Sequence, residues 1–241
     1  MSPSSVAIKD VRDSLNSYPK LSLFSNQNVY FIKGTWEVTF NNIVIEEYEI
    51  KIELSEKYPE ELPLVFELSN KIPKKADRHI NPKGNACLFV DDARWEIWPI
   101  GSSFLNFLTI PVSNFFLWQV YFAEYNQAPE WGERGHGEKG IIEYYLEKFE
   151  LNQNRKALNL LSAVNNTGPL KRQCPCDSGK NLAECHGTII DILKKNADKN
   201  RIRLAINIFQ KHVSQEFFIL NMKYYQFVKN IYSKKPFNLP T

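Results

Sequence analysis

The hydrophobic residues at the start of the chain recur at roughly helical spacing. Val6, Val11 and Leu15 would lie on one side of a helix, and Tyr18-Pro19 follows them. Proline has no amide hydrogen and disrupts a helix interior, so it marks the end of the pattern. The spacing therefore predicts a short amphipathic helix over residues 6–17.

Between Val29 and Leu68 the hydrophobic period changes to two. The alternating positions are Trp36, Val38, Phe40, Ile43, Ile45, Ile50, Ile52 and Leu54. This alternation is typical of strands with one face in the core and one in water. Asn41-Asn42 supplies a turn within it, and Pro63 precedes a further candidate strand over residues 64–68. The pattern predicts an antiparallel meander of three or more strands.

The next segment, residues 69–100, has no hydrophobic period. Pro73, Pro82, Gly84 and Pro99 interrupt it, and Cys87 lies near its middle. A long irregular segment inside a compact domain is usually either functional or disordered. This placement makes Cys87 the first candidate for chemistry.

No charged residue lies between Glu96 and Glu124, a run long enough to cross a bilayer. Polar side chains such as that of Gln119 interrupt the run, however, and polar groups are costly in hydrocarbon unless they are paired. We therefore predict a buried core helix over residues 104–122, bent near Pro111, and no membrane span.

Hydrophobic residues return to helical spacing in the second half of the chain, over residues 141–149, 158–164 and 188–231. Gly168-Pro169 separates the first two of these segments from the third. The predicted division is a main domain over residues 1–150, a helical linker over 151–169, a cysteine-rich motif over 170–187 and a helical extension over 188–241.

The composition is that of a globular protein. The 241 residues, 28.1 kDa in mass, are 43% hydrophobic and 24% charged. Charged residues such as Lys9, Asp10 and Arg12 stand where a secretory signal needs an unbroken apolar core, so a cytoplasmic location is expected. In a reducing compartment, one isolated cysteine and a cluster of three indicate a reactive thiol and a metal site rather than disulfides.

The charge is distributed unevenly along the chain. Residues 188–241 contain ten Lys or Arg against three Asp or Glu, whereas residues 1–187 contain 20 against 24. A basic extension on an acidic body suggests an acidic partner, either a protein surface or nucleic acid. A solvated helical face explains the same composition equally well.

An ordered set of residues surrounds Cys87. Tyr58-Pro59 and Pro63 precede the last strand, and the segment itself holds His79, Asn81, Gly84, Cys87, Leu88 and Trp95. This order resembles the active site of ubiquitin-conjugating enzymes, although Ile80 stands where that family has a proline. The short spacing from Asn81 to Cys87 is similar to that of bacterial members from ubiquitin-like conjugation and antiphage operons. The glycine-rich stretch around His136, at residues 132–140, is similar to theirs as well.

The resemblance, over about residues 1–150, implies an α+β fold with an opening helix, a meander sheet, an active-site loop and later helices. It implies a transferase that carries a ubiquitin-like modifier as a thioester on Cys87, receives it from an activating enzyme and passes it to a lysine of a target protein. Thiolates suit this role because they are strong nucleophiles and good leaving groups.

The neighbours of Cys87 have expected roles in the same chemistry. Acyl transfer places negative charge on a carbonyl oxygen, which an amide donor can stabilise. Asn81 is the first candidate for that donor and Asn85 the second. His79 is expected to hold the loop rather than to react. His136 either acts as a base or orients the lysine, or it caps the glycine-rich loop.

A second set of residues is suited to a metal. Cys174, Cys176, Cys185 and His186 lie within 13 positions and offer four ligands, the number a closed tetrahedral zinc site needs. The Cys-Pro-Cys-Asp-Ser-Gly-Lys turn and the later Cys-His resemble the SEC-C motif, which implies a structural zinc. The motif would then fix a small recognition surface.

Two other functions remain open from the sequence. A non-catalytic adaptor of the same fold would bind a protein partner through the zinc motif and the basic helices, with Cys87 merely packed. A nucleic-acid binder would use residues 188–241, and its binding would weaken strongly with salt. Replacing Cys87 by alanine separates the enzyme from the adaptor, because only the adaptor would keep its biological activity.

Overall fold

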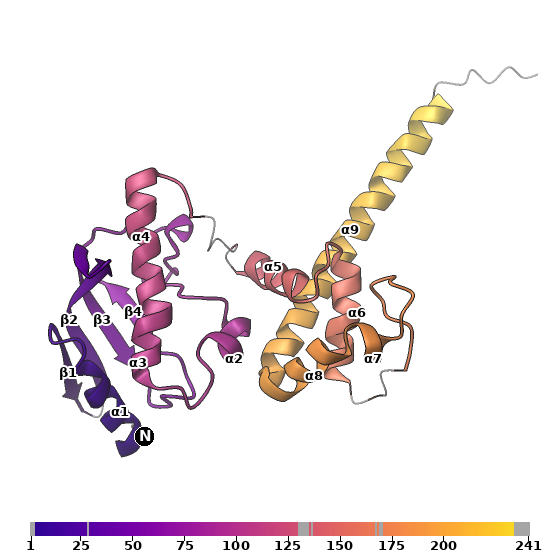
Figure 1. Ribbon diagram of the computed structural model, residues 1–241. Helices are drawn as coiled ribbons and strands as arrows, with labels where there is room; N and C mark the ends of the chain where they lie inside the picture. Colours follow the sequence, from indigo (N-terminus) through magenta and orange to yellow (C-terminus); the bar gives the residue numbers. More distant parts are fainter. Residues whose placement is uncertain are drawn as a thin grey trace, which may run out of the picture. The chain divides into compact units, whose positions relative to one another are not determined.

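The computed structural model describes residues 3–27, 29–129, 135, 137–166, 168 and 171–233. The chain divides into two compact units, Met1–Gly140 and Ile141–Thr241, and each is described by itself below. The division lies ten residues before the boundary at 150 that the sequence suggests. The fold is mixed α+β, with one four-stranded antiparallel sheet and several helices (Figure 1).

The opening helix, α1 (Ser5–Leu15), confirms the helix predicted over residues 6–17. Ser4 begins it by accepting a hydrogen bond from the amide of Ala7 at 3.2 Å, which satisfies an amide that has no partner within the helix. One face, including Val11 and Leu15, is buried in the core of the first unit. Val6, which the predicted pattern places on the same side, is instead 77% exposed, and Ala7 and Ile8 complete the buried face.

The sheet is a meander of β1 (Leu21–Asn26), β2 (Val29–Phe40), β3 (Ile43–Leu54) and β4 (Leu64–Glu67) in sequence order. Asn41 and Asn42 both adopt positive φ, 50° and 62°, so they form the tight hairpin turn that the sequence indicates. The edge strand β1 is additional to the predicted strands. Most of its residues are exposed or half-buried, so it lacks a strong apolar alternation.

The predicted bent helix consists of three pieces: α3 (Phe104–Phe107), a π-helical turn (Leu108–Val112) that contains Pro111, and α4 (Ser113–Tyr125). Proline removes an amide donor, and a π-turn accommodates the loss without ending the helix. Phe116 on α4 packs against Tyr48 of the sheet, with ring centroids 4.9 Å apart. No helix among the described residues is both long and apolar enough to cross a membrane.

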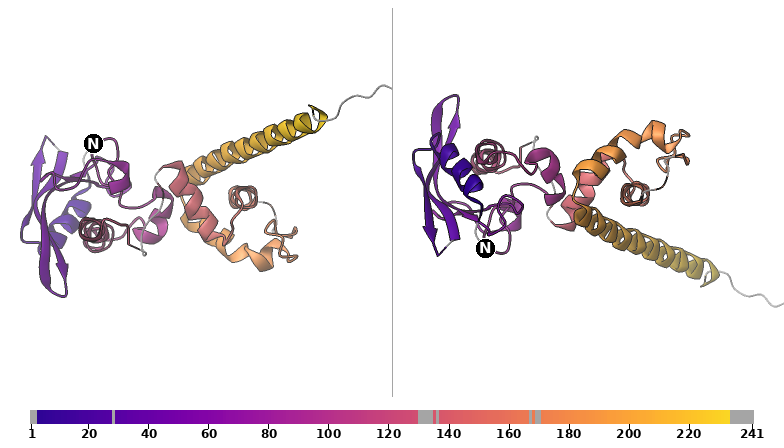
Figure 2. Two further views of the ribbon diagram at one scale, coloured as in Figure 1. Left: turned by 90° about the horizontal axis from the view of Figure 1, so that it is seen from above. Right: turned by 90° about the horizontal axis from the view of Figure 1, so that it is seen from below.

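Short helices frame the segment that contains Cys87, namely two 3₁₀ turns (Ala76–Arg78 and Asp91–Ala93) and α2 (Arg94–Ile97). The second unit is helical: α5 (Glu138–Lys148), which begins in the first unit, then α6 (Asn154–Asn165), α7 (Leu182–Cys185), α8 (Gly187–Asn196) and α9 (Lys199–Ser233). Figure 2 shows α9 as the longest of these helices. Its first half packs on α6 around Ala205 and Phe209, both fully buried.

Candidate functional site: a thiol on a short hairpin and a four-ligand cluster

The residues around Cys87 form a short antiparallel hairpin. The amide of Cys87 donates to the carbonyl of His79 at 2.7 Å, and the amide of Asn81 donates to the carbonyl of Asn85 at 2.8 Å. The amide of Gly84, which has a φ of +86°, donates back to the carbonyl of Asn81 at 2.8 Å and closes the turn. The sequence segment 79–87 therefore folds back on itself and brings His79 and Asn81 next to the strand that carries Cys87.

The core holds this hairpin on one side. Ile80 and Ala86 face each other across it, and both are 7% exposed. Because side chains alternate along extended strands, their neighbours Asn81 and Cys87 face away from the core, and both are half-buried. The amide of Ala86 also donates to Val65 of β4 at 2.7 Å, so the hairpin continues the sheet.

Asn81 and Asn85 differ in their surroundings. Asn85 is buried, and its side-chain amide donates to the carbonyl of Ala86 at 3.4 Å. The side-chain amide of Asn81 has no hydrogen-bond partner within the described part of the chain, and it is half exposed. Of the two, Asn81 is the one with a donor available for a ligand.

His79 lies against α4. Its ring meets the indole of Trp118 edge to face, with centroids 4.7 Å apart, and its backbone is left-handed with φ 51°. A ring packed in this way helps to hold the start of the hairpin in place. The holding role of His79 stays a prediction.

The segment before His79 is held by a buried amide that the sequence does not single out. Gln119 on α4 is fully buried, and its Nε2 donates to the carbonyl of Arg78 at 2.8 Å. In return, Nε and one terminal nitrogen of Arg78 donate to Oε1 of Gln119 at 3.1 and 2.9 Å. The guanidinium also lies over the ring of Phe122, 4.2 Å from its centroid. Gln119 thus connects α4 to the hairpin.

Replacing Gln119 by leucine should destabilise the first unit by about 2–3 kcal/mol, because a buried carbonyl and a guanidinium lose their partners. All five tryptophans lie within residues 1–140, so tryptophan fluorescence during urea unfolding reports on this unit. Glu124→Gln is the control, since Glu124 is an exposed residue of the same helix and should change stability by less than about 0.5 kcal/mol. Equal effects of the two substitutions would contradict the connecting role of Gln119.

The segment after Cys87 is tied to the loop between β3 and β4. The guanidinium of Arg94 donates to the backbone carbonyls of Pro59 and Glu60 and lies over the ring of Trp98. Trp98 is buried and stacks on Tyr58, with ring centroids 6.2 Å apart. The Tyr-Pro of the sequence pattern is thereby joined to the segment after Cys87 through Arg94 and Trp98, whereas the tryptophan of the pattern is Trp95.

The surroundings of Cys87 do not favour its thiolate form in the single chain. Burial raises its pKa, and the negative charge of Asp91 raises it further. Most of Cys87 is therefore protonated at neutral pH, because the thiolate fraction falls as the pKa rises. The rate of its alkylation should rise about tenfold per pH unit between pH 7 and 9, since the thiolate is the reacting form.

Burial and the charge of Asp91 both raise the pKa of Cys87. Replacing Asp91 by asparagine removes the second effect and should lower that pKa. We expect iodoacetamide to label Cys87 several-fold faster at pH 8, as measured by mass spectrometry of the Cys87 peptide. Glu60→Gln removes an exposed carboxylate that does not affect Cys87 and serves as the control. The difference should shrink in high salt because Asp91 is exposed. An unchanged labelling rate in Asp91→Asn would contradict this electrostatic coupling.

The glycine-rich stretch lies partly outside the described residues, and these exclude His136. Its described end approaches the segment after Cys87. A Cβ on Gly140 would lie 2.0 Å from the carbonyl oxygen of Gly135 and 3.4 Å from the side chain of Val90. Gly140 therefore allows the carbonyl of Gly135 to come this close, and any larger residue would displace that carbonyl, whereas the distance to Val90 is an ordinary contact.

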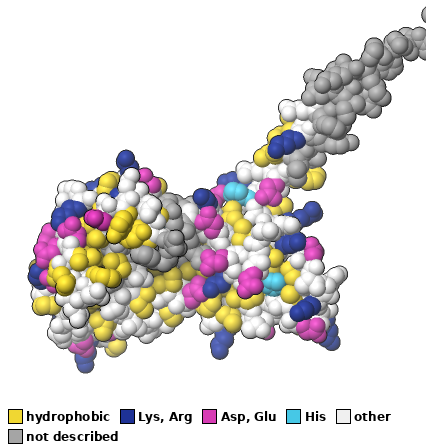
Figure 3. Space-filling view, turned by 45° about the horizontal axis from the view of Figure 1, so that its top comes forward, with side chains coloured by type: hydrophobic (Ala, Val, Ile, Leu, Met, Phe, Trp, Pro, Cys, Tyr) yellow, Lys and Arg dark blue, Asp and Glu magenta, His cyan; other side chains and the backbone are white. Residues whose placement is uncertain are grey.

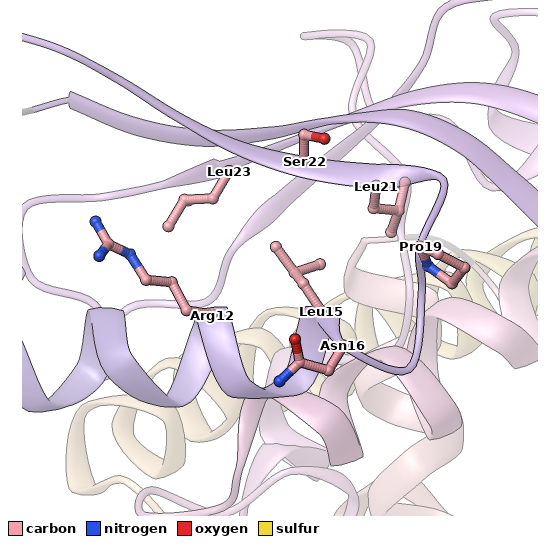
Figure 4. Close-up of a pocket in the computed structure, with 7 residues that line it drawn as sticks. All are labelled: Arg12, Leu15, Asn16, Pro19, Leu21, Ser22 and Leu23. Carbon is pink, nitrogen blue, oxygen red and sulfur yellow. The ribbon is translucent and has the colours of Figure 1, made fainter.

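The first unit also has a hollow that none of the candidate residues line. Figure 4 shows it between α1 and β1, where Leu15 of the helix and Leu23 of the strand point into the space between the two elements. It is wide open to solvent and belongs to the opposite end of the sheet order from β4, where the Cys87 hairpin attaches. The candidate chemistry is thus on the hairpin surface rather than in this hollow.

In the second unit the four predicted metal ligands come together. One ligand atom from each of Cys174, Cys176, Cys185 and His186 lies within 4.8 Å of all the others. Sγ of Cys174 is 3.1 Å from Nδ1 of His186, and the sulfurs of Cys176 and Cys185 are 3.4 Å apart. Ligands about 2.3 Å from a tetrahedral zinc stand about 3.8 Å apart, so this donor set fits the ion.

Local structure explains how the ligands meet. The amide of Cys174 donates to the carbonyl of Lys180 at 2.9 Å, which closes the turn containing Cys176. Asn181 then caps the short helix α7 by accepting from the amide of Glu184 at 2.9 Å, and the helix delivers Cys185 to the cluster. Ser178 lies 3.2 Å from the sulfur of Cys185.

The histidine of the cluster is oriented by a group outside the motif. Its Nε2 lies 2.9 Å from the backbone carbonyl of Phe149, at the end of α5, so Nδ1 is the nitrogen directed at the cysteines. Metal-binding histidines usually place their second ring nitrogen against such an acceptor. The contact also joins the motif to the helical body of its unit.

The thiols of the cluster differ in their readiness to ionise. Burial raises the pKa of Cys174 to about 12. Burial also acts to raise the pKa of Cys176, but hydrogen bonds involving Ser178, Cys174 and Cys185 outweigh it and lower the pKa to about 6. At least one thiolate is therefore present at neutral pH to begin binding a cation.

Comparison with known proteins identifies the second site alone. Residues 173–188 match the SEC-C motif, a zinc-binding type, and these residues include all four ligands. The resemblance seen in the sequence is thus confirmed for this motif. Searches of curated proteins and of solved structures returned no significant match.

Figure 3 bears on the basic extension. On the face that it shows, the Lys and Arg side chains of the second unit lie among Asp and Glu side chains rather than in one continuous patch. Lys195, Lys199 and Arg203 are exposed, as a solvated helical surface would require. This face gives no concentrated basic surface for nucleic acid.

Proposed function

We propose that the chain is a ubiquitin-conjugating-type transferase that carries a ubiquitin-like modifier as a thioester on Cys87. The observation that carries the proposal is the hairpin of residues 79–87. It presents a half-buried cysteine directly across from His79. The side-chain amide of Asn81, two positions after His79, has no hydrogen-bond partner among the described residues. The ordered motif of the sequence supplies the chemical class.

The order of elements supports the same proposal. A helix, a meander sheet, an irregular segment with the candidate nucleophile and a long bent helix follow one another as the resemblance requires. Tyr58-Pro59, which the resemblance stresses before the last strand, is held by Arg94 and Trp98, two residues of the segment after Cys87. A fold alone does not imply a function, so the proposal rests on the site.

In the first step Cys87 attacks the thioester carbonyl carbon of a modifier held on an activating enzyme. A new carbon–sulfur bond forms, the old one breaks, and the proton of the Cys87 thiol passes to the departing sulfur. A thiol with a raised pKa suits an exchange that begins only on docking, because it stays protonated and resistant to oxidants until then.

In the second step a neutral lysine amine of the target attacks the Cys87 thioester. The carbon–nitrogen bond forms as the carbon–sulfur bond breaks, and the sulfur receives the proton that the amine loses. Asn81 stabilises the negative charge on the carbonyl oxygen, a contribution of about two orders of magnitude in rate for one such donor. His79 positions the hairpin, and His136 lies outside the described residues.

In the second unit Cys174, Cys176, Cys185 and His186 would hold one zinc ion. With four protein ligands and no open position, the ion would be structural. It would fix the turn and α7 as a small surface for a partner or target. The setting that the resemblance implies, a bacterial antiphage or ubiquitin-like conjugation system, belongs to this proposal.

The experiment is reconstitution with the cognate activating enzyme, modifier and ATP. A second band of higher mass should appear on a non-reducing gel and disappear when reductant is added, because thiols cleave thioesters. The cysteines of the metal cluster are kept intact, so only Cys87 is free to carry the adduct. A reaction that leaves the chain unmodified would contradict the proposal.

One observation favours a different function. The raised pKa of Cys87 is also what a merely packed thiol would show, as in a non-catalytic adaptor that binds a protein through the metal motif and the basic helices. An adaptor would keep its biological activity after Cys87→Ala, whereas the transferase would lose it. The same variant thus decides between the two functions.

A further inference from the structure

Strand β1 forms one edge of the sheet. β2 pairs with it on one side, and among the described residues no strand pairs with it on the other (Figure 1). The carbonyl of Lys20, just before the strand, accepts from the amide of Thr35 of β2 at 3.2 Å. Backbone groups alternate in direction along an antiparallel strand, so the even-numbered residues of β1 face β2. The residues whose backbone groups face away from the sheet are therefore Leu21, Leu23 and Ser25.

Most of these outward groups have no partner. The amide of Leu21 donates to the carbonyl of Tyr18 at 2.9 Å, but no hydrogen bond within the described part of the chain reaches Leu23 or Ser25 from the open side. Edge strands are usually protected from other chains by a charge, a proline or a bulge. Residues 21–26 contain no charge and no proline, and they pair with β2 without a shift in register. The edge can therefore accept a further strand.

A hollow lies beside this open edge. Its volume is about 490 Å³, and the residues that line it come from α1, β1 and the turn between them, with none from β2. Leu15 of the helix and Leu23 of the strand point into it (Figure 4). Since β2 covers the other side of β1, the hollow opens along the free edge. A strand added there would place every second side chain over the hollow.

The flank of α1 that borders the hollow is basic. Arg12 lines the hollow, and Lys9 stands one turn earlier on the same side of the helix. Both are exposed, and Arg12 has no hydrogen bond or ion pair within the described residues. Asp10 lies on the opposite flank, where its carboxylate accepts from the amide of Phe104 at 2.7 Å, and Asp13 is not among the lining residues. The charge beside the open edge is therefore positive.

We propose that this edge binds an extended, acidic peptide segment of a partner protein, which joins the sheet beside β1 as a fifth strand. The backbone groups of Leu23 and Ser25 supply the pairing, which is sequence-independent. An apolar side chain of the peptide fills the hollow against Leu15 and Leu23, and an acidic side chain pairs with Arg12. The surface lies at the other end of the sheet order from the Cys87 hairpin, so the proposal does not depend on the chemistry of Cys87.

A second copy of the chain fits this edge less well than an acidic peptide does. Two β1 strands would pair about a twofold axis, which places both α1 helices on the same face of the joined sheet. The flanks that carry Lys9 and Arg12 would then face each other across the seam, and like charges repel. An acidic peptide supplies the opposite charge at the same place.

The first test is fluorescence anisotropy with the full chain and a set of short labelled peptides. Each peptide has threonine at every second position and Leu, Val, Phe or Glu at the others, so one face of the extended peptide is apolar and acidic. Members with at least one Glu should bind with a Kd of about 100 μM or tighter. Replacing each Glu by Lys should weaken binding about tenfold or more, because the charge near Arg12 is reversed.

The backbone of both partners shows where the peptide binds. N-methylation of the peptide should abolish binding at alternate positions only, because every second amide faces β1. In the chain, hydrogen exchange at the amides of Leu23 and Ser25, followed by NMR, should slow about tenfold or more when the peptide is saturating. The amides of Ser22 and Phe24 face β2 and are the internal control.

Charge variants test the role of the helix flank. Arg12→Glu should weaken binding of the Glu-containing peptides about tenfold, because an attraction becomes a repulsion. Lys33→Glu is the matched control: it makes the same change of charge on the opposite face of the sheet, where Lys33 lies over Phe31, and it should have little effect. Cys87→Ala should bind the peptides as the natural chain does, so this result is independent of any thioester.

The following results would overturn the proposal. One is a set of peptides of which none binds more tightly than about 1 mM. Equal effects of Arg12→Glu and Lys33→Glu, or a preference for Lys-containing peptides, would contradict the charge complementarity. Binding that leaves exchange at Leu23 and Ser25 unchanged would place the peptide elsewhere. Protection of the same amides by dimerisation of the chain, without peptide, would show that a second copy occupies the edge.

Discussion

Removing the metal from the second unit should unfold the motif of residues 172–186 and loosen α8. The ligand atoms of Cys174, Cys176 and Cys185 are brought together by a turn and a four-residue helix, too little structure to persist unaided. Zinc binding to such small motifs contributes apparent free energies of about 10–16 kcal/mol at neutral pH, and that energy is folding energy. A chelator should therefore abolish amide exchange protection in this segment.

Two variants separate the loss of the metal site from effects on the rest of the chain. Elemental analysis should find one zinc per chain in the natural sequence and none in Cys174→Ser/Cys185→Ser. Cys87→Ser is the matched control, because it removes the fourth cysteine without touching the cluster, and it should keep its zinc. Tryptophan fluorescence reports only on residues 1–140 and should not change on chelation. Zinc retained by the double variant, or unchanged protection after chelation, would contradict the site.

Replacing Cys87 by alanine should abolish the thioester adduct, with a loss of many orders of magnitude in transfer. Removing a covalent nucleophile leaves no group to take its place, unlike the removal of a residue that only orients the reaction. The measurement is the reductant-sensitive band in the reconstituted reaction. Cys87 is half-buried and lies away from the core face of its hairpin, so the fold should tolerate the change.

Two controls accompany this variant. The urea midpoint from tryptophan fluorescence should stay close to that of the natural chain, which shows that the first unit still folds. Cys87→Ser should form at most an oxygen ester. Reductant should not cleave this ester, because oxygen esters react with thiols far more slowly than thioesters do. A reductant-sensitive adduct that persists in Cys87→Ala would place the thioester on another cysteine.

The sequence predicts the elements whose signals are local. The opening helix, the hairpin at Asn41-Asn42 and the helix bent at Pro111 each follow from periodicity or from a residue with a restricted backbone. The four metal ligands are equally local, since 13 consecutive positions contain them all. The edge strand β1 is missing from the prediction, because its alternation is too weak to stand out from a loop.

The supports of both sites are long-range and could not be predicted in the same way. Gln119 reaches Arg78 across 41 positions, and the carbonyl of Phe149 meets His186 across 37. A backbone carbonyl carries no signal in the sequence. Gln119 carries a faint one, because it is a polar residue within an uncharged apolar run and must find a partner if that run is buried.

Intact mass spectrometry of the Cys87→Lys variant, taken after reaction with the cognate activating enzyme, modifier and ATP, tests the central claim most directly. A lysine at this position should accept the modifier as an isopeptide, so the chain should gain the mass of the modifier less one water. The product should resist reductant, unlike the adduct of the natural chain, and fragmentation should place it on residue 87. An unmodified mass for both the natural chain and Cys87→Lys would contradict a thioester-carrying role for Cys87.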